Sequence, residues 1–139
     1  MDNFITCEQF KERLGILCVT SGQTTFTRRL RDRHILLKSM VLELDATKTY
    51  TEQEIDKTLM LWLSTIGEQI EVDYVNLRRL LVDFGYLWRA EDGSFYRVTS
   101  TNYDNVVFEP TINNVNHYSI IRKHKILVEQ KKRAYYTLQ

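Results

Sequence analysis

The sequence predicts a mainly α-helical α+β fold of the winged helix-turn-helix type, in which three helices precede a two- or three-stranded wing and additional helices lie at the N- and C-terminal ends. Three observations support this prediction. Amphipathic helical stretches fill the region from Phe26 to Phe84, the pattern changes to extended aromatic-rich runs after Gly85, and Asp92-Gly93 separates two of these runs. Helix, short extended segment, helix, helix and hairpin is the order of elements in a winged helix.

The chain has 139 residues, of which 43% are hydrophobic, so it can form one core but is short for two domains of usual size. We expect an N-terminal helix over residues 1–22, a winged-helix domain over 23–105, and a loop followed by a basic amphipathic helix over 106–139. Charged residues interrupt every apolar run before the roughly 18 residues that a membrane span needs, and a secretory leader pattern is absent. We therefore expect a cytoplasmic protein that does not contact a membrane.

Two helices are predicted in the first third of the chain. The first ends at Ser21 and Gly22 and has an apolar side made of Phe10, Leu14, Leu17 and Cys18. The second is expected to begin near Thr25 or Thr27, with its arginines turned mostly outward and an apolar side made of Phe26, Leu30, Leu37, Val41 and Leu44. His34 shares this apolar side, and we expect a packed imidazole with one hydrogen-bond partner.

A capping box marks the start of the next helix. Thr51 is followed three residues later by Glu54, a pair that satisfies two amide donors at a helix N-terminus, and Tyr50 is left extended just before it. The apolar stripe of this helix consists of Ile55, Leu59, Trp62 and Leu63, and the helix should end at Ile66 and Gly67. Its charged residues are expected in solvent: Glu52, Glu54, Asp56 and Lys57.

The last helix of the winged-helix unit is predicted from about Val72 to Gly85, with a buried stripe made of Leu77, Leu80, Leu81 and Phe84. The opposite face holds the first candidates for recognition, which are Tyr74, Asn76, Arg78, Arg79 and Asp83. Arg78 and Arg79 lie about 100° apart around the helix, so they cannot point the same way. One of them can reach back to Asp73 or Asp83, and two interpretations stay open: the pair contacts phosphate or base edges, or the pair braces the helix against the wing.

Large aromatic side chains gather around the predicted hairpin and its neighbouring helices. They could form a stacking platform for unpaired bases, but rings on apolar stripes normally fill the interior. We expect core packing for all of these residues: Trp62, Phe84, Trp88, Phe95 and Tyr96.

Residues 102–110 are predicted to form a loop that leads into a final helix from about Asn114. Apolar residues recur in this helix at intervals of three and four, and two histidines and a lysine interrupt the stripe. The stripe requires a partner surface, and we expect a homodimer formed through this helix rather than a membrane contact. Its members are His117, Ile120, Ile121, His124, Leu127, Val128, Lys131, Ala134 and Tyr135.

Several kinds of chemistry lack their usual residue patterns. Cys7 and Cys18 are flanked by apolar residues and suit small buried hydrophobes better than a disulfide. The cysteines and the three histidines do not have the spacing of a zinc site, so we expect no metal and no cofactor. Because a nucleophile elbow, a phosphate loop and a deaminase signature are also absent, we do not expect an enzyme.

Three segments of the sequence resemble a known family. They are Tyr50-Thr51 with Glu54-Ile55, the run Leu-Arg-Arg-x-Leu-Val-Asp-x-Gly-x-Leu-x-Arg from Leu77 to Arg89, and Gly93-x-x-Tyr96. Together they resemble an uncharacterised prokaryotic domain family that occurs alone or fused behind the DNA-binding domains of small bacterial transcriptional regulators. The resemblance covers roughly residues 26–98. It implies regulation by association and brings no established activity.

Charge is unevenly distributed along the chain and decides which surfaces could meet phosphate. Residues 26–50 hold six basic and three acidic side chains, residues 51–85 hold three and seven, and residues 111–139 hold six and one. We expect a DNA-binding transcriptional regulator that contacts phosphate through its basic helices and wing. The candidate contacts are Arg28, Arg29, Arg31, Arg78, Arg79, Arg89, Arg97, Arg122, Lys123, Lys125, Lys132 and Arg133.

One group of acids argues against this hypothesis. Glu68, Glu71 and Asp73 precede the helix that would approach the duplex, where each would repel phosphate. The alternative is a non-enzymatic protein-interaction module, an adaptor or inhibitor, that uses the acidic face of the winged-helix unit and the C-terminal helix. The basic C-terminal helix also has a simpler interpretation, because charge on the outer side of a helix often only keeps that side in water.

Overall fold

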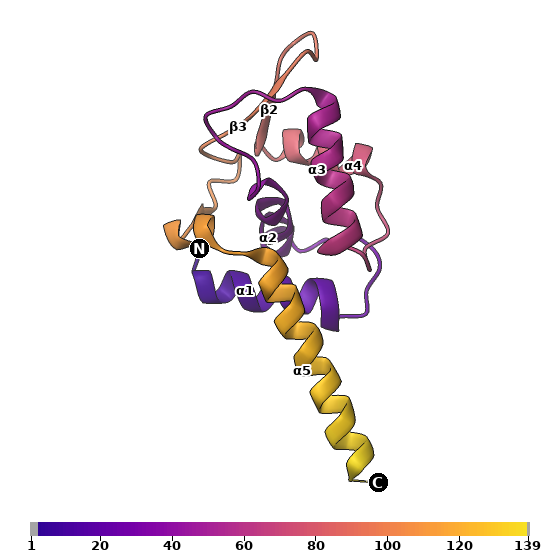
Figure 1. The fold of residues 1–139 in the computed structure, drawn as a ribbon. Helices are drawn as coiled ribbons and strands as arrows, with labels where there is room; N and C mark the ends of the chain where they lie inside the picture. The colour runs from indigo at the N-terminus through magenta and orange to yellow at the C-terminus, as the bar shows by residue number, and fades with distance from the viewer. Residues whose placement is uncertain (1–2, 139) are drawn as a thin grey trace.

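Three helices and an antiparallel hairpin form the centre of the fold in this computed structural model, which describes residues 3–138. They are α2 (Leu30–Val41), α3 (Glu52–Thr65), α4 (Tyr74–Asp83), β2 (Leu87–Arg89) and β3 (Tyr96–Val98). Figure 1 shows the hairpin at one end of the molecule, beside the start of α3, with α4 behind α3. The order and arrangement of these elements are consistent with a winged-helix-like fold, as the sequence predicts.

A single residue outside the hairpin, Tyr50, pairs with its second strand. Leu87 pairs with Val98 and Arg89 with Tyr96 across β2 and β3. Tyr50, the residue predicted to be extended, forms an antiparallel bridge to Tyr96, with backbone N···O distances of 2.9 and 2.7 Å. This bridge ties the segment before α3 to the hairpin, as in a three-stranded wing.

The capping box at the start of α3 is confirmed. The Thr51 hydroxyl accepts a hydrogen bond from the Glu54 amide at 3.2 Å, and the Glu54 carboxylate accepts one from the Thr51 amide at 2.9 Å. Ile55, Leu59 and Trp62 are buried, as predicted.

The start of α2 differs from the prediction. The helix begins at Leu30, after an extended segment, and not near Thr25 or Thr27. The Thr27 hydroxyl accepts from the Arg29 amide and the Thr27 carbonyl accepts from Arg33 Nε at 2.7 Å. Local bonds of this kind compete with helical ones, and they leave Leu30 exposed instead of on the buried side.

An N-terminal layer and a small parallel sheet lie outside the winged-helix elements. α1 (Cys7–Gly15) begins with its own capping box at Thr6 and continues as a π-helical turn over Ile16–Thr20. β1 (Phe4–Ile5) pairs in parallel with β4 (Val107–Phe108). The predicted loop over residues 102–110 therefore contains a strand. The sequence does not indicate this strand, because each of the two paired strands has only two residues and they lie far apart along the chain.

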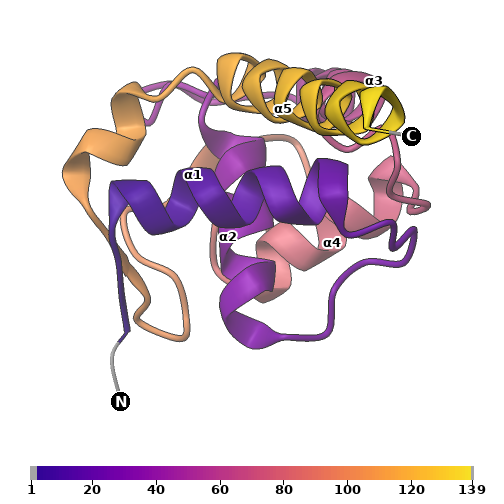
Figure 2. The same ribbon diagram turned by 90° about the horizontal axis from the view of Figure 1, so that it is seen from below.

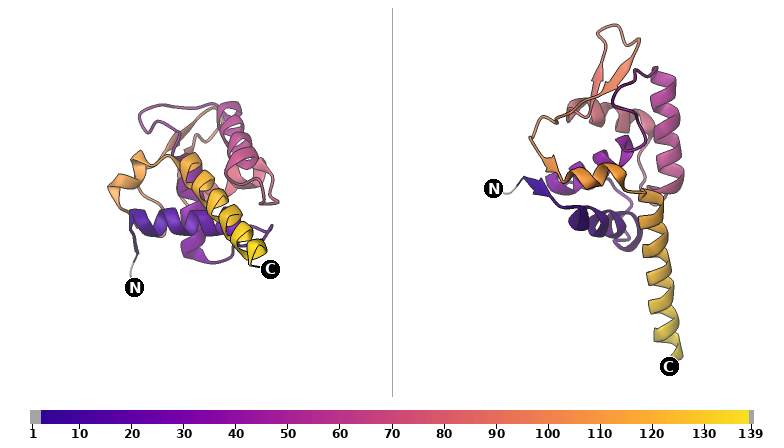
Figure 3. Two further views of the ribbon diagram at one scale, coloured as in Figure 1. Left: turned by 60° about the horizontal axis from the view of Figure 1, so that its bottom comes forward. Right: turned by 60° about the vertical axis from the view of Figure 1, so that its left-hand side comes forward.

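The last helix starts later than predicted. A 3-10 helix over Pro110–Asn114 comes first, and α5 (His117–Thr137) begins after Asn116, whose side chain caps it. Figure 2 shows α5 lying over α1, and Figure 3 shows its C-terminal half projecting from the body, away from the hairpin. The two helices approach closely at Gly15, where an added Cβ would collide with the ring of His124. No helix among residues 3–138 is long and apolar enough to cross a membrane.

One hydrophobic core joins the winged-helix elements to α1 and to the first turns of α5. Leu77 and Leu81 of α4 are fully buried in it, and Leu80 and Phe84 pack against its edge. The packing of α4 predicted from its apolar stripe is therefore confirmed. Other large buried side chains come from every layer: Ile5, Phe10, Leu14, Ile35, Leu36, Leu37, Met40, Ile55, Leu59, Ile66 and Tyr96.

Candidate nucleic-acid interface

α4 presents one exposed polar face beside the hairpin. Because Leu77 and Leu81 point into the core, the residues on the other side of the helix face outward. Asn76, Arg79 and Asp83 occupy that exposed side. Among residues 3–138, no ion pair involves Arg79, so its guanidinium is available to a ligand.

The neighbouring Arg78 has a different environment. Its guanidinium pairs with Asp56 and lies 3.5 Å from Glu52, both on α3, and its side chain is only 17% exposed. This arginine braces α4 against α3. The prediction that Asp56 stays in solvent is wrong, because it pairs with a cation 22 residues further along the chain. The two adjacent arginines thus point different ways, as their helical positions require.

The outer face of the hairpin carries an arginine stacked on a tryptophan. The guanidinium of Arg97 lies 5.0 Å from the centre of the Trp88 ring, and the Phe95 ring lies 5.5 Å from the same ring. Trp88 is 43% exposed, so the prediction that it belongs to the core is wrong. Strand alternation explains the difference, since its neighbour Leu87 takes the inward position.

The inner face of the hairpin holds Arg89 close to α3 and α4. Arg89 Nε donates to the Tyr96 hydroxyl at 3.3 Å, and that hydroxyl donates to Glu52 at 2.8 Å. Burial raises the pKa of Tyr96, so the phenol stays protonated as the donor. Gly93 has a φ of +75°, as the hairpin turn requires, and an added side chain there would collide with the Arg89 guanidinium.

A small cleft of about 290 Å³ lies where α3, α4 and the hairpin meet. It brings together three arginines, Arg78 and Arg79 of α4 and Arg89 of the hairpin. It is lined by Glu52, Arg78, Arg79, Val82, Asp83, Arg89 and Tyr96. We call the cleft together with Asn76 and Arg97 the α4–hairpin surface.

The acids near the start of α4 are largely engaged by other groups. Asp73 caps the helix, because its carboxylate accepts the Asn76 amide at 2.7 Å. Glu68 pairs with Lys125 of α5 at 2.6 Å. Among residues 3–138, Glu71 takes part in no ion pair, and its exposed carboxylate would repel an approaching phosphate.

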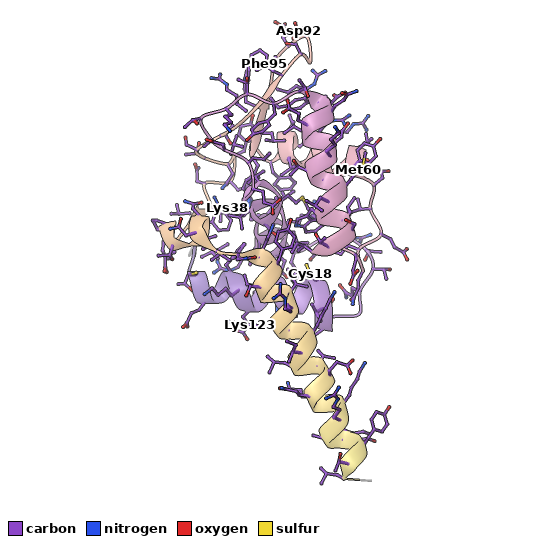
Figure 4. The ribbon with its side chains drawn as sticks, viewed as in Figure 1. Cys18, Lys38, Met60, Asp92, Phe95 and Lys123 are labelled. Atoms are coloured by element: carbon purple, nitrogen blue, oxygen red, sulfur yellow. The ribbon has the colours of Figure 1, made fainter. Side chains whose placement is uncertain are left out.

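The other candidate cations do not join this surface. Arg28 and Arg29 are exposed in the segment before α2, and Arg31 donates to the Phe4 carbonyl and the Gln9 side chain at 3.1 and 3.0 Å. Figure 4 places Asp92 and Phe95 at the tip of the hairpin and Lys123 on α5 beside α1, towards the opposite end of the molecule. The cations of α5 therefore lie far from the wing: Arg122, Lys123, Lys125, Lys132 and Arg133.

The buried histidines form networks that sequence spacing did not reveal. His34 contacts the Tyr86 hydroxyl at 2.6 Å and Asp104 at 2.8 Å, so it has two partners and not the single one predicted. Both partners are more than 50 residues away in sequence, and only the fold brings them to the imidazole.

A second network links a serine, a histidine and a glutamate. Ser39 Oγ lies 3.1 Å from His117 Nδ1, and His117 Nε2 lies 3.4 Å from Glu43. The Ser39 hydroxyl is fully buried and also accepts from the Trp62 indole at 3.0 Å. This chain joins α2, α3 and α5, and a substrate cannot reach its hydroxyl.

Both cysteines are unpaired. Cys18 is buried, and burial raises the pKa of its thiol to about 12. Among residues 3–138, no group of three or more histidine, cysteine, aspartate or glutamate side chains could hold a metal ion.

One family of known proteins matches this chain. The family is described as an uncharacterized protein conserved in bacteria (DUF2087), and its match covers residues 24–98, more than half of the sequence. The chain belongs to this DUF2087 family. The match spans α2, α3, α4 and the hairpin, whereas α1 and α5 lie outside it. No curated protein and no solved structure matches the chain significantly.

Proposed function

We propose that this DUF2087 protein binds DNA through its α4–hairpin surface and acts as a transcriptional regulator. The observation that carries the proposal is the exposed face of α4, with Asn76 and Arg79, next to a hairpin that carries Arg89 and Arg97. In winged-helix proteins the corresponding helix enters the major groove and the wing contacts the backbone or minor groove. The resemblance to domains fused to bacterial regulators supports the same role.

The residue types suit the two kinds of contact that such binding needs. Arginine and asparagine side chains form paired hydrogen bonds with guanine and adenine edges, which suits Arg79 and Asn76 on the helix. Arg97 on the wing suits a phosphate contact, and its stacking on Trp88 limits the rotamer freedom it would lose on binding. Arg78 is a positioning residue in this proposal, because Asp56 and Glu52 already hold it.

Electrostatics favour weak, salt-sensitive binding by a single chain. The Lys125 pair and the α4 cap reduce the repulsion that Glu68 and Asp73 would exert on phosphate, while Glu71 retains its full effect. We expect a dissociation constant in the micromolar range for random duplex, about that of non-specific binding at physiological salt.

Fluorescence anisotropy with labelled random duplex over a salt series tests the proposal. The variants Arg79→Ala and Arg97→Ala remove cations that make no ion pair within residues 3–138. Each should weaken binding at least threefold and reduce the slope of log affinity against log salt by about 1.

The matched control is the pair Lys132→Ala and Arg133→Ala on the projecting half of α5, which removes the same charge far from the wing. These changes should leave the slope within experimental error. Binding that depends on the α5 pair and ignores Arg79 and Arg97, or anisotropy that stays flat at low salt, would contradict the proposal.

A second function, as a protein-interaction module, has one observation in its favour. The projecting half of α5 carries large apolar side chains that are exposed in the structure of residues 3–138. This surface leads to the inference below, which does not depend on DNA binding.

A further inference from the structure

The C-terminal half of α5 exposes large apolar side chains along a helix that leaves the body of the molecule (Figures 1 and 3). Leu127 is 51% exposed and Ile126 is 49% exposed. Closer to the C-terminus, Tyr135, Tyr136 and Leu138 are also exposed. Side chains of this size and number on one short segment indicate a contact surface.

The projecting segment lacks the tertiary contacts that normally stabilise a helix. Every residue from 129 to 138 is exposed, so this part of α5 does not pack on the core. Isolated helices shorter than about 12–15 residues are marginal in water even with good helix formers. A partner that covers the segment would supply the missing stabilisation.

The apolar stripe of α5 is continuous between its buried and its exposed halves. Ile120 and Ile121 are buried against the body, and His124 packs on Gly15. At intervals of three and four residues the same stripe continues with Leu127, Val128, Lys131, Ala134, Tyr135 and Leu138. The buried half therefore shows that the side of α5 that carries the stripe is the side that packs against other elements.

A groove runs along α5 next to this stripe. It lies between α1 and α5, has a volume of about 670 Å³, and has Cys7, Val115, Ile120 and Leu127 among its apolar lining residues. Ile120 and Leu127 belong both to the groove and to the stripe. The α1 side of the groove carries Glu8 and Glu12 with Lys11 between them, and Lys123 lies on its α5 side; all four side chains are exposed.

We propose that a second copy of this chain packs antiparallel against α5, so that the end of each helix enters the α1–α5 groove of the other copy. A second copy fits because one chain carries both halves of the contact, the uncovered stripe and the groove that can receive it. In a two-fold pair each copy then uses both at once. The antiparallel direction brings the distal segment of one helix back over the proximal segment of its partner.

Charge supports the same occupant. The distal segment carries three bases, Lys131, Lys132 and Arg133, against one acid, and the α1 edge of the groove in the other copy carries two acids, Glu8 and Glu12, against one base. Lys131 lies on the stripe itself, where its aliphatic stem can pack while its ammonium reaches the acidic edge. Arg122 and Lys125 lie one third of a turn or more from Leu127 and stay at the outer side of the pair.

Two neighbouring substitutions provide a matched test by sedimentation equilibrium between about 5 and 500 µM. Leu127 and Ile126 are equally exposed but about 100° apart around the helix, and only Leu127 belongs to the stripe. The wild-type chain should reach twice its mass of 16.6 kDa. Leu127→Glu should remain at the monomer mass, and Ile126→Glu should dimerise within threefold of wild type, with equal far-UV circular dichroism at low concentration.

A charge reversal tests the role of the groove edge. Glu12→Lys should weaken the dimer at least threefold at low salt, and adding Lys132→Glu should restore it. A wild-type chain that stays monomeric up to 500 µM, or equal loss of the dimer in both Leu127→Glu and Ile126→Glu, would overturn the proposal. Dimer measurements in the absence of DNA keep this result separate from that of the DNA-binding proposal.

Discussion

At the scale of single residues, the neighbouring arginines Arg78 and Arg79 have different environments. Helical geometry alone separates their directions. The tertiary structure then decides which one is free, because Asp56 and Glu52 of α3 engage Arg78 and no acid pairs with Arg79 among residues 3–138. The sequence shows the separation but not the choice, since both acids lie more than 20 residues upstream.

The pH dependence of stability follows from the burial of His117. Burial lowers the pKa of this imidazole below its ordinary value of 6.5, and the nearby Glu43 opposes that shift only in part. The unfolded chain therefore binds more protons than the folded chain just below pH 6.5. The contribution of the neutral, buried His117 to the free energy of unfolding is therefore complete above pH 6.5, and it decreases as the pH falls towards the pKa of His117 in the folded chain.

We predict that the free energy of unfolding in urea decreases between pH 7.5 and pH 5.5, and that His117→Gln reduces this decrease. His124→Gln is the control, because His124 is only half-buried at the edge of the α1–α5 groove. The decrease should remain in the control. An equal decrease in wild type and in His117→Gln would show that another group causes it.

At the scale of elements, local signals in the sequence identify helix and hairpin boundaries well. The capping box at Thr51, the Asp92-Gly93 turn and the apolar stripe of α4 each act within a few residues, and all three predictions are confirmed. The start of α2 differs from the predicted position, because bonds to Thr27 stabilise an extended segment. The pairing of β1 with β4 joins residues about 100 apart, for which the sequence offers no local signal.

The capping box of α3 should contribute measurably to stability. Thr51→Ala removes the hydroxyl that accepts the Glu54 amide, and we expect a loss of about 1 kcal/mol in the free energy of unfolding. Thr51→Ser keeps the hydroxyl and should lose less than half as much. Chemical denaturation monitored by the fluorescence of Trp62 and Trp88 measures both values. Equal effects of the two substitutions would mean that the hydroxyl does not cap the helix in solution.

At the scale of the whole molecule, the two candidate binding surfaces lie at opposite ends. The α4–hairpin surface lies at one end and the projecting half of α5 at the other (Figure 1). The candidate cations predicted from the sequence thus divide into distinct groups, because charge patterning along a chain does not reveal where the fold places each segment. The family match covers the first surface and ends before α5, so the projecting helix lies outside the matched residues.

We propose that DNA binds at the α4–hairpin surface, and its position on the protein can be mapped residue by residue. Amide chemical shifts of ¹⁵N-labelled protein, recorded during titration with a short random duplex, measure it directly. We predict that the largest changes fall on residues 74–83 and 87–98, at Asn76, Arg79 and Arg97 above all. Changes confined to residues 122–138, or no changes at low salt with the duplex in excess, would contradict it.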